Sequence, residues 1–166
     1  MQWQSYRFVS GLLFLASVIG MAFALYLEHV QGLDPCPLCI FQRIGLIGLG
    51  LISLIALLHH PRTNVFRRFY AFLGLLSIGW SVAIAGRHVW LQNLPPDQVP
   101  SCGPGLNYWV DTLPLKEVFA NVLKGSGECA MIDWTFLGQS LPVWSLTFFS
   151  VLALISLWQL FRKYPT

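Results

Sequence analysis

Four long apolar stretches limit what this chain can fold into more than any other feature of its sequence. They cover residues 8–27, 38–58, 69–90 and 141–161, and each is close to the roughly 20 residues that an α-helix needs to cross a bilayer. Only 10% of the 166 residues are charged and 55% are hydrophobic, whereas an ordinary soluble domain has about 25% charged residues. This composition excludes soluble globular and disordered proteins. It predicts an all-α membrane protein, a four-helix transmembrane bundle in which residues 1–166 form one domain.

The charged residues outside these stretches are distributed unevenly. Basic side chains gather at both termini and in the connector 59–68: Arg7, Arg62, Arg67, Arg68, Arg162 and Lys163. All acidic residues lie in the connectors 28–37 and 91–140: Glu28, Asp34, Asp97, Asp111, Glu117, Glu128 and Asp133. Because Lys and Arg mark the cytoplasmic side of a membrane protein, we expect cytoplasmic termini and two outward-facing connectors. The first stretch could instead be a signal peptide, but it is longer than the usual apolar region of about 7–15 residues.

The connector 91–140 is long for a loop without structure of its own, which marks it as functional or disordered. Residues 113–125 carry an amphipathic helical pattern, because apolar side chains recur at helical spacing and polar ones take the opposite face. The apolar positions are Leu115, Val118, Phe119, Val122 and Leu123. Asp111 or Thr112 could cap this helix, and Gly125 could end it. We expect it to lie flat on the outer membrane surface or, alternatively, to pack on the loops of the bundle.

All four cysteines, Cys36, Cys39, Cys102 and Cys129, lie on the outward side, and this placement implies an oxidising compartment. Four cysteines permit three disulfide pairings. The short spacing of Cys36 and Cys39, a CxxC motif, favours a local and reducible disulfide, which leaves Cys102 to pair with Cys129. Closing that second loop would stabilise the fold by roughly 3–4 kcal/mol.

The CxxC motif opens the second apolar stretch, where Pro37 suits the first position of a helix. A thiolate at Cys39 would therefore lie at the positive end of the helix dipole. Arg43 follows four residues later on the same helix face, within reach of that sulfur or of an anionic ligand beside it. An arginine inside an apolar span is costly and is a functional candidate, although it could also snorkel to the interface. His88, near the outer end of the third stretch, is a weaker candidate, since it could simply be solvated.

Three other interpretations of the cysteines compete with a redox role. A four-cysteine zinc site usually pairs two CxxC knuckles, and Cys102 and Cys129 are too far apart in sequence to form the second, so no metal site is predicted. A c-type haem needs CxxCH, whereas Ile40 follows Cys39. Two static disulfides in a non-enzymatic membrane scaffold with an interaction loop form the main alternative.

The order of these motifs resembles the DsbB family of bacterial inner-membrane thiol oxidases over almost the whole chain. The matching residues are Glu28-His29-Val30, Pro35-Cys36-Pro37-Leu38-Cys39-Ile40, Arg43, His88, Leu113-Pro114-Leu115, Ser126-Gly127-Glu128-Cys129, Trp134-Thr135-Phe136-Leu137-Gly138 and Leu141-Pro142-Val143-Trp144. The related vitamin K epoxide reductases carry the CxxC on the last helix, so the order here disfavours them. This chain has Gln42 where family members commonly have an acidic residue, which changes the local charge but not the core pattern.

The resemblance implies a quinone-dependent protein-disulfide oxidoreductase. A reduced periplasmic partner of the DsbA type would attack a disulfide between Cys102 and Cys129, and Cys129 would then exchange with the CxxC pair. Two electrons would pass from Cys39 to ubiquinone, or to menaquinone under anaerobic conditions, beside Arg43 and His88. The resemblance further implies a multi-pass bacterial inner-membrane protein with periplasmic cysteines, cytoplasmic termini and no nucleic-acid partner. A paralogue of the DsbI type, which serves a dedicated partner, is the alternative within the family.

Overall fold

The computed structural model describes residues 2–95, 97–103, 106–132 and 134–162, and these are mostly helical, as predicted for an all-α bundle. Four of the helices are long and apolar enough to cross a membrane. They are α1 (Gln2–His29), α2 (Pro37–His59), α3 (Asn64–Gln92) and α7 (Leu141–Phe161). Helix α3 begins ahead of the predicted stretch and includes Arg67 in its first turn, where the guanidinium donates to the carbonyl of Pro61 at 2.9 Å.

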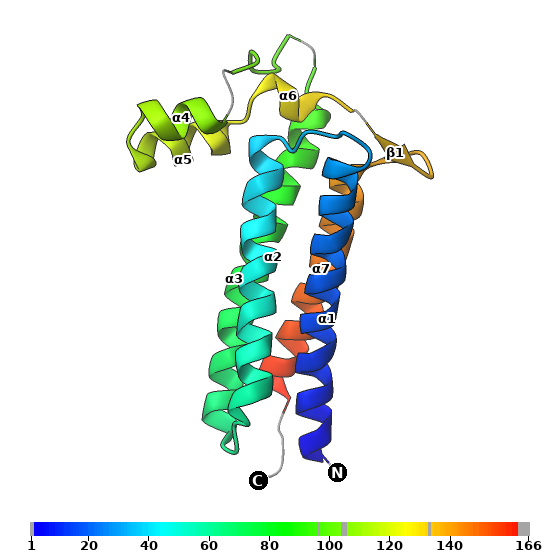
Figure 1. Cartoon of the computed structure of the whole chain (residues 1–166), viewed down its shortest axis with the longest axis vertical. Helices are drawn as coiled ribbons and strands as arrows, with labels where there is room; N and C mark the ends of the chain where they lie inside the picture. Colours follow the sequence, from blue (N-terminus) through cyan, green and yellow to red (C-terminus); the bar gives the residue numbers. More distant parts are fainter. Residues whose placement is uncertain (1, 96, 104–105, 133, 163–166) are drawn as a thin grey trace.

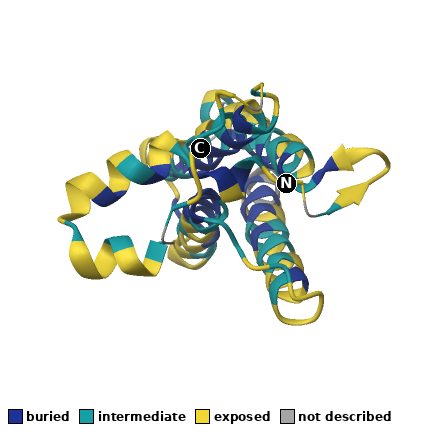
Figure 2. Cartoon of the chain, turned by 90° about the horizontal axis from the view of Figure 1, so that it is seen from above, coloured by how far each residue is buried: buried dark blue, intermediate teal, exposed yellow. Residues whose placement is uncertain are grey.

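The four long helices stand side by side, with both termini and the connection between α2 and α3 at one end (Figure 1). We call this the terminal end, and we call the opposite end, which carries the other connections, the loop end. Helix α3 packs along α2 and α7, and α1 packs mainly on α2, whereas α1 and α7 touch little. The central core consists of Val9, Leu13, Leu46, Leu49, Ile78, Ala85, Phe149 and Leu152. Many other large apolar residues are exposed, as a lipid-facing surface requires. Figure 2 shows buried and exposed positions alternating along the helices.

Small residues and serines bring α2 and α3 into close contact. A Cβ at Gly45 would lie only 2.5 Å from the carbonyl oxygen of Ser77, so a larger residue does not fit there. Ser77 donates to the Gly45 carbonyl at 2.9 Å, and Ser81 donates to the Gln42 carbonyl at 2.8 Å. Close backbone approach and hydrogen bonds of this kind hold helices together in lipid. These contacts fix the first turns of α2, and with them the CxxC motif, relative to α3.

The connection between α3 and α7 folds across the loop end (Figure 1). It contains α4 (Leu106–Thr112), α5 (Leu115–Lys124), α6 (Gly127–Ala130) and the antiparallel pair β1 (Thr135–Phe136) and β2 (Gln139–Ser140). The predicted amphipathic helix is α5, but its predicted cap is wrong, because Asp111 and Thr112 belong to α4 and Pro114 precedes α5. Thr112 instead donates to the carbonyl of Tyr108, one turn back in α4.

Helix α5 packs on the bundle with one face, where the Phe119 ring also lies edge-on against the Phe41 ring of α2, with 5.2 Å between the centroids. Val118 and Val122 are buried in a cluster with Leu38 of α2 and Leu91 of α3. Other apolar side chains of the helix are exposed: Leu115, Phe119 and Leu123. Helix α5 therefore packs on α2 and α3 of the bundle, whereas the alternative stated from the sequence was packing on its loops. The position of α5 on a membrane surface stays a prediction.

Arg87 and Gly125 fix the C-terminal end of α5. From α3, Arg87 donates to the carbonyl of Leu123 at 3.1 Å and to that of Lys124 at 3.2 Å. A cation at this position also interacts favourably with the helix dipole. Gly125 has a φ of +83°, and a Cβ there would collide with Leu91, so glycine is required where the chain turns from α5 toward α6.

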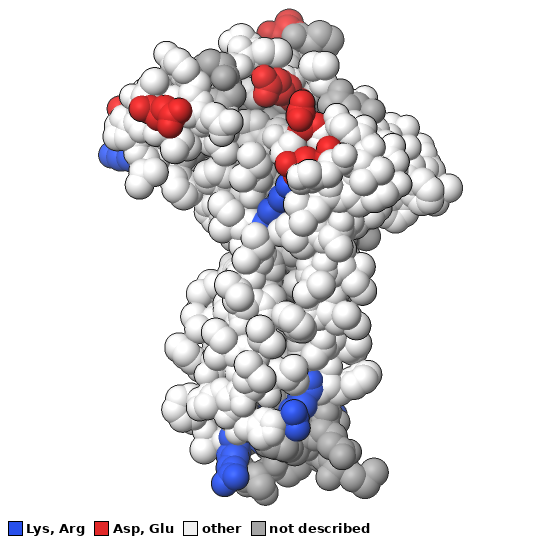
Figure 3. Space-filling model, in the orientation of Figure 1, with Lys and Arg blue, Asp and Glu red and all other residues white. Residues whose placement is uncertain are grey.

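Charged side chains separate between the two ends of the molecule. On the face that Figure 3 shows, the acidic side chains all lie at the loop end, whereas basic side chains lie at both ends and are the only charged ones visible at the terminal end. Asp133 and Lys163, which belong to the same predicted pattern, lie outside the described residues. The orientation of the chain in a membrane, which was inferred from this pattern, stays a prediction.

Candidate active site

The CxxC motif forms the start of α2. Cys36 is the N-cap residue, and Pro37 follows in the first turn. The Cys36 sulfur accepts the backbone N–H of Cys39 at 3.3 Å, and the two sulfurs lie 3.0 Å apart. Both residues are thiols in this structure, and a disulfide between them requires an approach of only about 1 Å. The N-terminus of a membrane-spanning helix therefore places two thiols in position to join.

His88 reaches both of these sulfurs from α3. Its Nε2 lies 3.9 Å from the Cys36 sulfur, and its Nδ1 lies 3.9 Å from the Cys39 sulfur. Gln42, which is buried in α2, places its Nε2 3.3 Å from His88 Nδ1. An amide N–H that donates to Nδ1 leaves the ring proton on Nε2, on the side of Cys36. His88 itself is buried, so the interpretation of a solvated interfacial histidine is wrong.

Cys129 joins this cluster from α6, far away in the sequence. Its side chain is 1% exposed, and its sulfur, the Cys36 sulfur and a ring nitrogen of His88 all lie within 4.8 Å of one another. A hydrogen bond to Cys36, together with burial, raises the pKa of the Cys129 thiol well above its usual range. Cys129 is therefore a protonated and protected thiol at neutral pH, held against the CxxC motif.

Cys102 is not part of this cluster and is exposed. Its segment runs along the start of α6, where the Ser101 carbonyl accepts the N–H of Gly127 at 3.3 Å. A Cβ at Gly127 would lie 3.0 Å from the Cys102 sulfur, so glycine at this position allows the close approach. The predicted disulfides, Cys102 with Cys129 and Cys36 with Cys39, stay predictions, because all four residues are thiols here.

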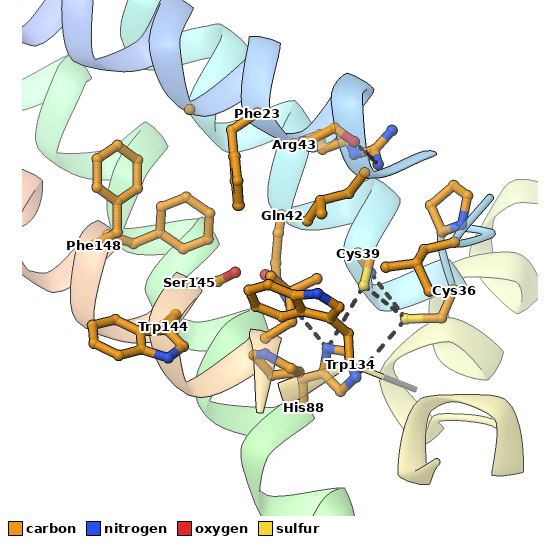
Figure 4. Close-up of a pocket in the computed structure, with 18 of the residues that line it drawn as sticks. Phe23, Cys36, Cys39, Gln42, Arg43, His88, Trp134, Trp144, Ser145 and Phe148 are labelled. Atoms are coloured by element: carbon orange, nitrogen blue, oxygen red, sulfur yellow. Dashed lines mark hydrogen bonds between the residues drawn. The ribbon is translucent and has the colours of Figure 1, made fainter. Parts of the chain in front are cut away.

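A cavity of about 450 Å³ lies beside the thiols at the loop end, between α1 and α7. Cys36, Cys39 and His88 line one side of it, and the other walls are mainly apolar (Figure 4). Aromatic side chains come from α1, from α7 and from the segment before the hairpin: Phe23, Trp134, Trp144 and Phe148. A largely apolar cavity of this size with a few polar groups on one side is typical of a site for a small organic ligand.

Arg43 lines the same cavity, but its guanidinium binds α1. It donates to the carboxylate of Glu28 and, at 3.4 Å, to the carbonyl of Ala24. The side chains of Arg43 and Glu28 are 21% and 27% exposed, so this ion pair is only partly screened by solvent. The sequence placed Arg43 within reach of the Cys39 sulfur or of a ligand beside it, whereas the hydrogen bonds that the structure gives its guanidinium go to α1.

The structure brings together Cys36, Cys39, His88 and Cys129, and it places Arg43 on the wall of the adjoining cavity. Sequence reasoning missed Glu28 as the partner of Arg43. A signal was present, because an acid at the end of one apolar stretch and an arginine near the start of the next lie at similar depth, where charges are usually paired. Of the aromatic cavity residues, Trp134 and Trp144 belong to the matching motifs, although the sequence did not assign them to a cavity. Phe23 and Phe148 carried no signal, because apolar side chains occur throughout the chain.

Comparison with known proteins agrees with the motifs. Residues 6–159 match the family model described as disulfide bond formation protein DsbB. A protein of Acinetobacter baumannii named disulfide bond formation protein B is 71% identical, over 97% of this chain and 94% of its own length. The protein of that name from Acinetobacter baylyi is 70% identical over 99% and 96%. A third, from Psychrobacter cryohalolentis, is 54% identical over 98% and 94%.

Proposed function

The chain belongs to the DsbB family of disulfide-forming membrane proteins, and from this premise we propose that it re-oxidises a periplasmic dithiol oxidant of the DsbA type and passes the electrons to a quinone. The observation that carries the proposal is the contact between two thiol segments beside an apolar cavity. Cys129 lies against Cys36, and Cys39 faces the cavity wall that also holds Arg43. Thiols in this spatial order can pass electrons from Cys129 to the CxxC motif and from there to a ligand in the cavity.

The first exchange takes place at the exposed cysteine. A thiolate of the reduced partner attacks the Cys102 sulfur of a disulfide between Cys102 and Cys129, and Cys129 leaves. The second thiol of the partner then displaces Cys102, so the partner departs oxidised. Cys102 and Cys129 now hold the two electrons and two protons as thiols. The exposure of Cys102 supports its role as the point of attack, because a protein partner cannot reach the buried Cys129.

The second exchange carries these electrons to the membrane-spanning helix. Cys129 attacks Cys36 of a disulfide between Cys36 and Cys39, and Cys39 leaves as a thiolate at the N-terminus of α2, where the helix dipole stabilises it. Cys102 then attacks Cys129, which restores the outer disulfide and leaves Cys36 and Cys39 reduced. Because Cys129 rests as a protonated thiol, it must lose its proton to react. The buried His88 ring lies within 4.8 Å, and its Nε2 can take that proton once the Gln42 amide turns so that its oxygen accepts an Nδ1–H.

The cavity fits a quinone ring in size and chemistry. Its apolar and aromatic walls suit a flat hydrophobic ring, and its polar groups stand on the side of Cys39. A bound quinone would supply a two-electron, two-proton acceptor, with ubiquinone as the proposed species and menaquinone under anaerobic conditions. Cys36 and Cys39 then rejoin as a disulfide. Arg43 and His88 would hold the oxygen atoms of the ring and the Cys39 thiolate.

The same proposal includes the orientation of the chain. The acidic loop end with all four cysteines would face the periplasm, and the basic terminal end with both termini would face the cytoplasm. The cysteines would then meet a periplasmic partner, and the cavity between α1 and α7 would face the bilayer, where quinones dissolve.

The test is a thiol count without oxygen. The purified and fully reduced protein in detergent is mixed with a soluble ubiquinone analogue, quenched with acid and alkylated, and the free thiols are counted by intact mass. We expect thiols to disappear rapidly in pairs. If all four thiols persist in the presence of quinone, the oxidase proposal fails, and a scaffold with static disulfides becomes the better account.

The control separates chemistry from folding. Cys39→Ser should lower the rate of quinone-coupled thiol loss at least about 1,000-fold, because the attacking thiolate is gone, while the helical circular dichroism stays unchanged. Ser53→Ala, at the terminal end of α2, should leave the rate within about twofold. Equal rates for Cys39→Ser and the wild type would remove Cys39 from the mechanism.

A further inference from the structure

The thiol cluster has the geometry of a metal site. Cys36, His88 and Cys129 come from three separate segments, and their sulfur and nitrogen atoms all lie within 4.8 Å of one another. In a tetrahedral zinc site the bonds are about 2.3 Å to sulfur and about 2.0 Å to nitrogen, which puts ligand atoms roughly 3.5–3.8 Å apart. An inward movement of about 1 Å would therefore bring these three atoms onto one ion.

We propose that the reduced protein binds one Zn²⁺ ion through Cys36, His88 and Cys129, with the fourth coordination position open. Two thiolates and an imidazole form a soft ligand set, which selects zinc over magnesium or calcium. The four-cysteine set considered from the sequence is a different one. The site proposed here has no second CxxC motif. Its other two ligands are His88 and Cys129, which lie near Cys36 only in the folded chain.

The surroundings of His88 support this assignment. The amide of Gln42 lies 3.3 Å from Nδ1, and it can turn so that its oxygen accepts an Nδ1–H while Nε2 binds the ion. A hydrogen bond of this kind to the second ring nitrogen is the usual support of a zinc-bound histidine. The cavity also reaches Cys36 and His88, which gives the ion a path to ligands that are otherwise buried.

Binding would hold the protein in a reversible inactive state. The ion displaces the two thiol protons and binds both sulfurs, so neither electrons nor disulfides are exchanged in this step. Cys129 and Cys36 are then unable to attack or accept a thiolate until the ion leaves. Forms in which either cysteine is part of a disulfide lack a ligand and should not bind zinc. The reduced enzyme, and not the oxidised one, is therefore sensitive to the metal.

Cobalt provides a spectroscopic test of the ligand set. The fully reduced protein in detergent, without oxygen, quinone or partner, is titrated with Co²⁺ and then with Zn²⁺. We expect one equivalent of Co²⁺ with thiolate charge-transfer and tetrahedral absorption bands, which Zn²⁺ removes. Cys129→Ser and His88→Ala should each lower the cobalt affinity by more than about 100-fold, since loss of an outer-shell group alone costs about 10–100-fold. Cys102→Ser, the matched control, should bind as the wild type does.

Two results would overturn the site. If Cys129→Ser and His88→Ala keep the wild-type affinity, the CxxC motif alone holds the metal. If Cys102→Ser loses binding as strongly as Cys129→Ser, the ligands are the cysteines of both loops. Unchanged circular dichroism and a single elution peak establish that each variant is folded, and His88→Gln provides a second substitution at that position. Because the titration contains no quinone, its failure leaves the oxidase proposal standing, and the thiol count is likewise independent of the metal.

Discussion

The two ends of the bundle consist of the same four helices but differ in how tightly these helices pack. The loop end encloses a cavity of about 450 Å³, whereas the terminal end leaves a crevice of about 10 Å³, barely enough for one water molecule. At the terminal end Gln159 of α7 donates to Ser10 of α1 at 3.1 Å, and both side chains are buried. At the loop end the ring of Phe148 stands against Gly20 of α1. The buried hydrogen bond thus joins α1 and α7 at the terminal end, and interhelical hydrogen bonds of this kind help to hold helices together in lipid.

The largest expected effect is a difference in alkylation rate between two cysteines at the loop end, which tests whether α6 shields Cys129 from solvent. In the reduced protein, iodoacetamide at pH 8 should modify the exposed Cys102 at least about 100 times faster than the buried Cys129. The pKa of Cys129 is raised by its hydrogen bond to Cys36 and by burial, so its alkylation rate should keep rising above pH 10. Peptide mass spectrometry measures both rates, and similar rates for the two thiols at pH 8 would mean that α6 does not shield Cys129.

The same pKa shift makes a prediction about stability. The folded state favours the protonated Cys129, and this preference stabilises the fold. The stabilisation is complete below the pKa of an unfolded cysteine, about 8.5, and is lost as the pH rises toward the higher folded value. Denaturant unfolding of the reduced protein at pH 7 and pH 10 should show that loss, and Cys129→Ala should remove this part of the pH dependence. A variant that retains the full dependence would assign it to other groups.

Arg43→Ala tests whether the charge in the cavity wall matters for ligand binding. The affinity for a quinone analogue should fall about 10- to 30-fold, as expected for the loss of a charged hydrogen-bond donor. Arg43→Lys should recover only part of it, because lysine lacks the planar fork of donors. Arg62→Ala, an exposed arginine at the terminal end, is the control. Unchanged quinone affinity in Arg43→Ala would show that Arg43 serves only its ion pair with Glu28.

Ser10→Ala should open the terminal end without affecting the loop end. The Gln159 amide would lose its partner, and the free energy of unfolding should fall by about 1 kcal/mol. Quinone affinity should stay within about twofold, because the cavity lies at the other end. A large loss of quinone binding with unchanged stability would contradict the separation of the two ends.

Gly20→Ala should give the smallest effect. The added Cβ would lie 2.9 Å from the Phe148 ring, which can swing into the cavity. We expect quinone affinity to fall about threefold with little change in stability, since a flexible side chain gives way at low cost. The same substitution at Gly11, which has open space around it, is the control. Equal affinities for both variants would mean that Phe148 does not limit the size of the cavity.

Local signals in the sequence account for much of the fold. The apolar stretches predicted the four long helices, and the apolar spacing predicted α5, because both patterns depend only on neighbouring residues. The capping error at Asp111 and Thr112 has the same origin. Both residue types suit a helix start, and the signal could not reveal that they finish α4.

The site was predicted less completely, because its contacts join segments far apart in the chain. The CxxC at the start of a helix can be recognised locally, and so can Arg43 inside an apolar stretch. The burial of Cys129 against Cys36 depends on α5 and α6 folding across α2 and α3, and the binding of Arg43 by Glu28 depends on how α1 packs on α2. No local pattern indicates the contact of Cys129 with Cys36, and the pairing of Arg43 with Glu28 is indicated only by the similar depth of the two charges in consecutive apolar stretches.

The hydrogen bonds from Arg87 to the end of α5 have a consequence for the rate of the proposed exchange between Cys129 and the CxxC motif. By fixing the residues that lead to α6, it keeps the Cys129 thiol at a high effective concentration toward Cys36. Under the proposed function, exchange between the two loops would then be a unimolecular step whose rate does not depend on how much protein the membrane contains. The encounters with the soluble partner and with the quinone would remain bimolecular, so the abundance of these two reactants would set the pace of the cycle.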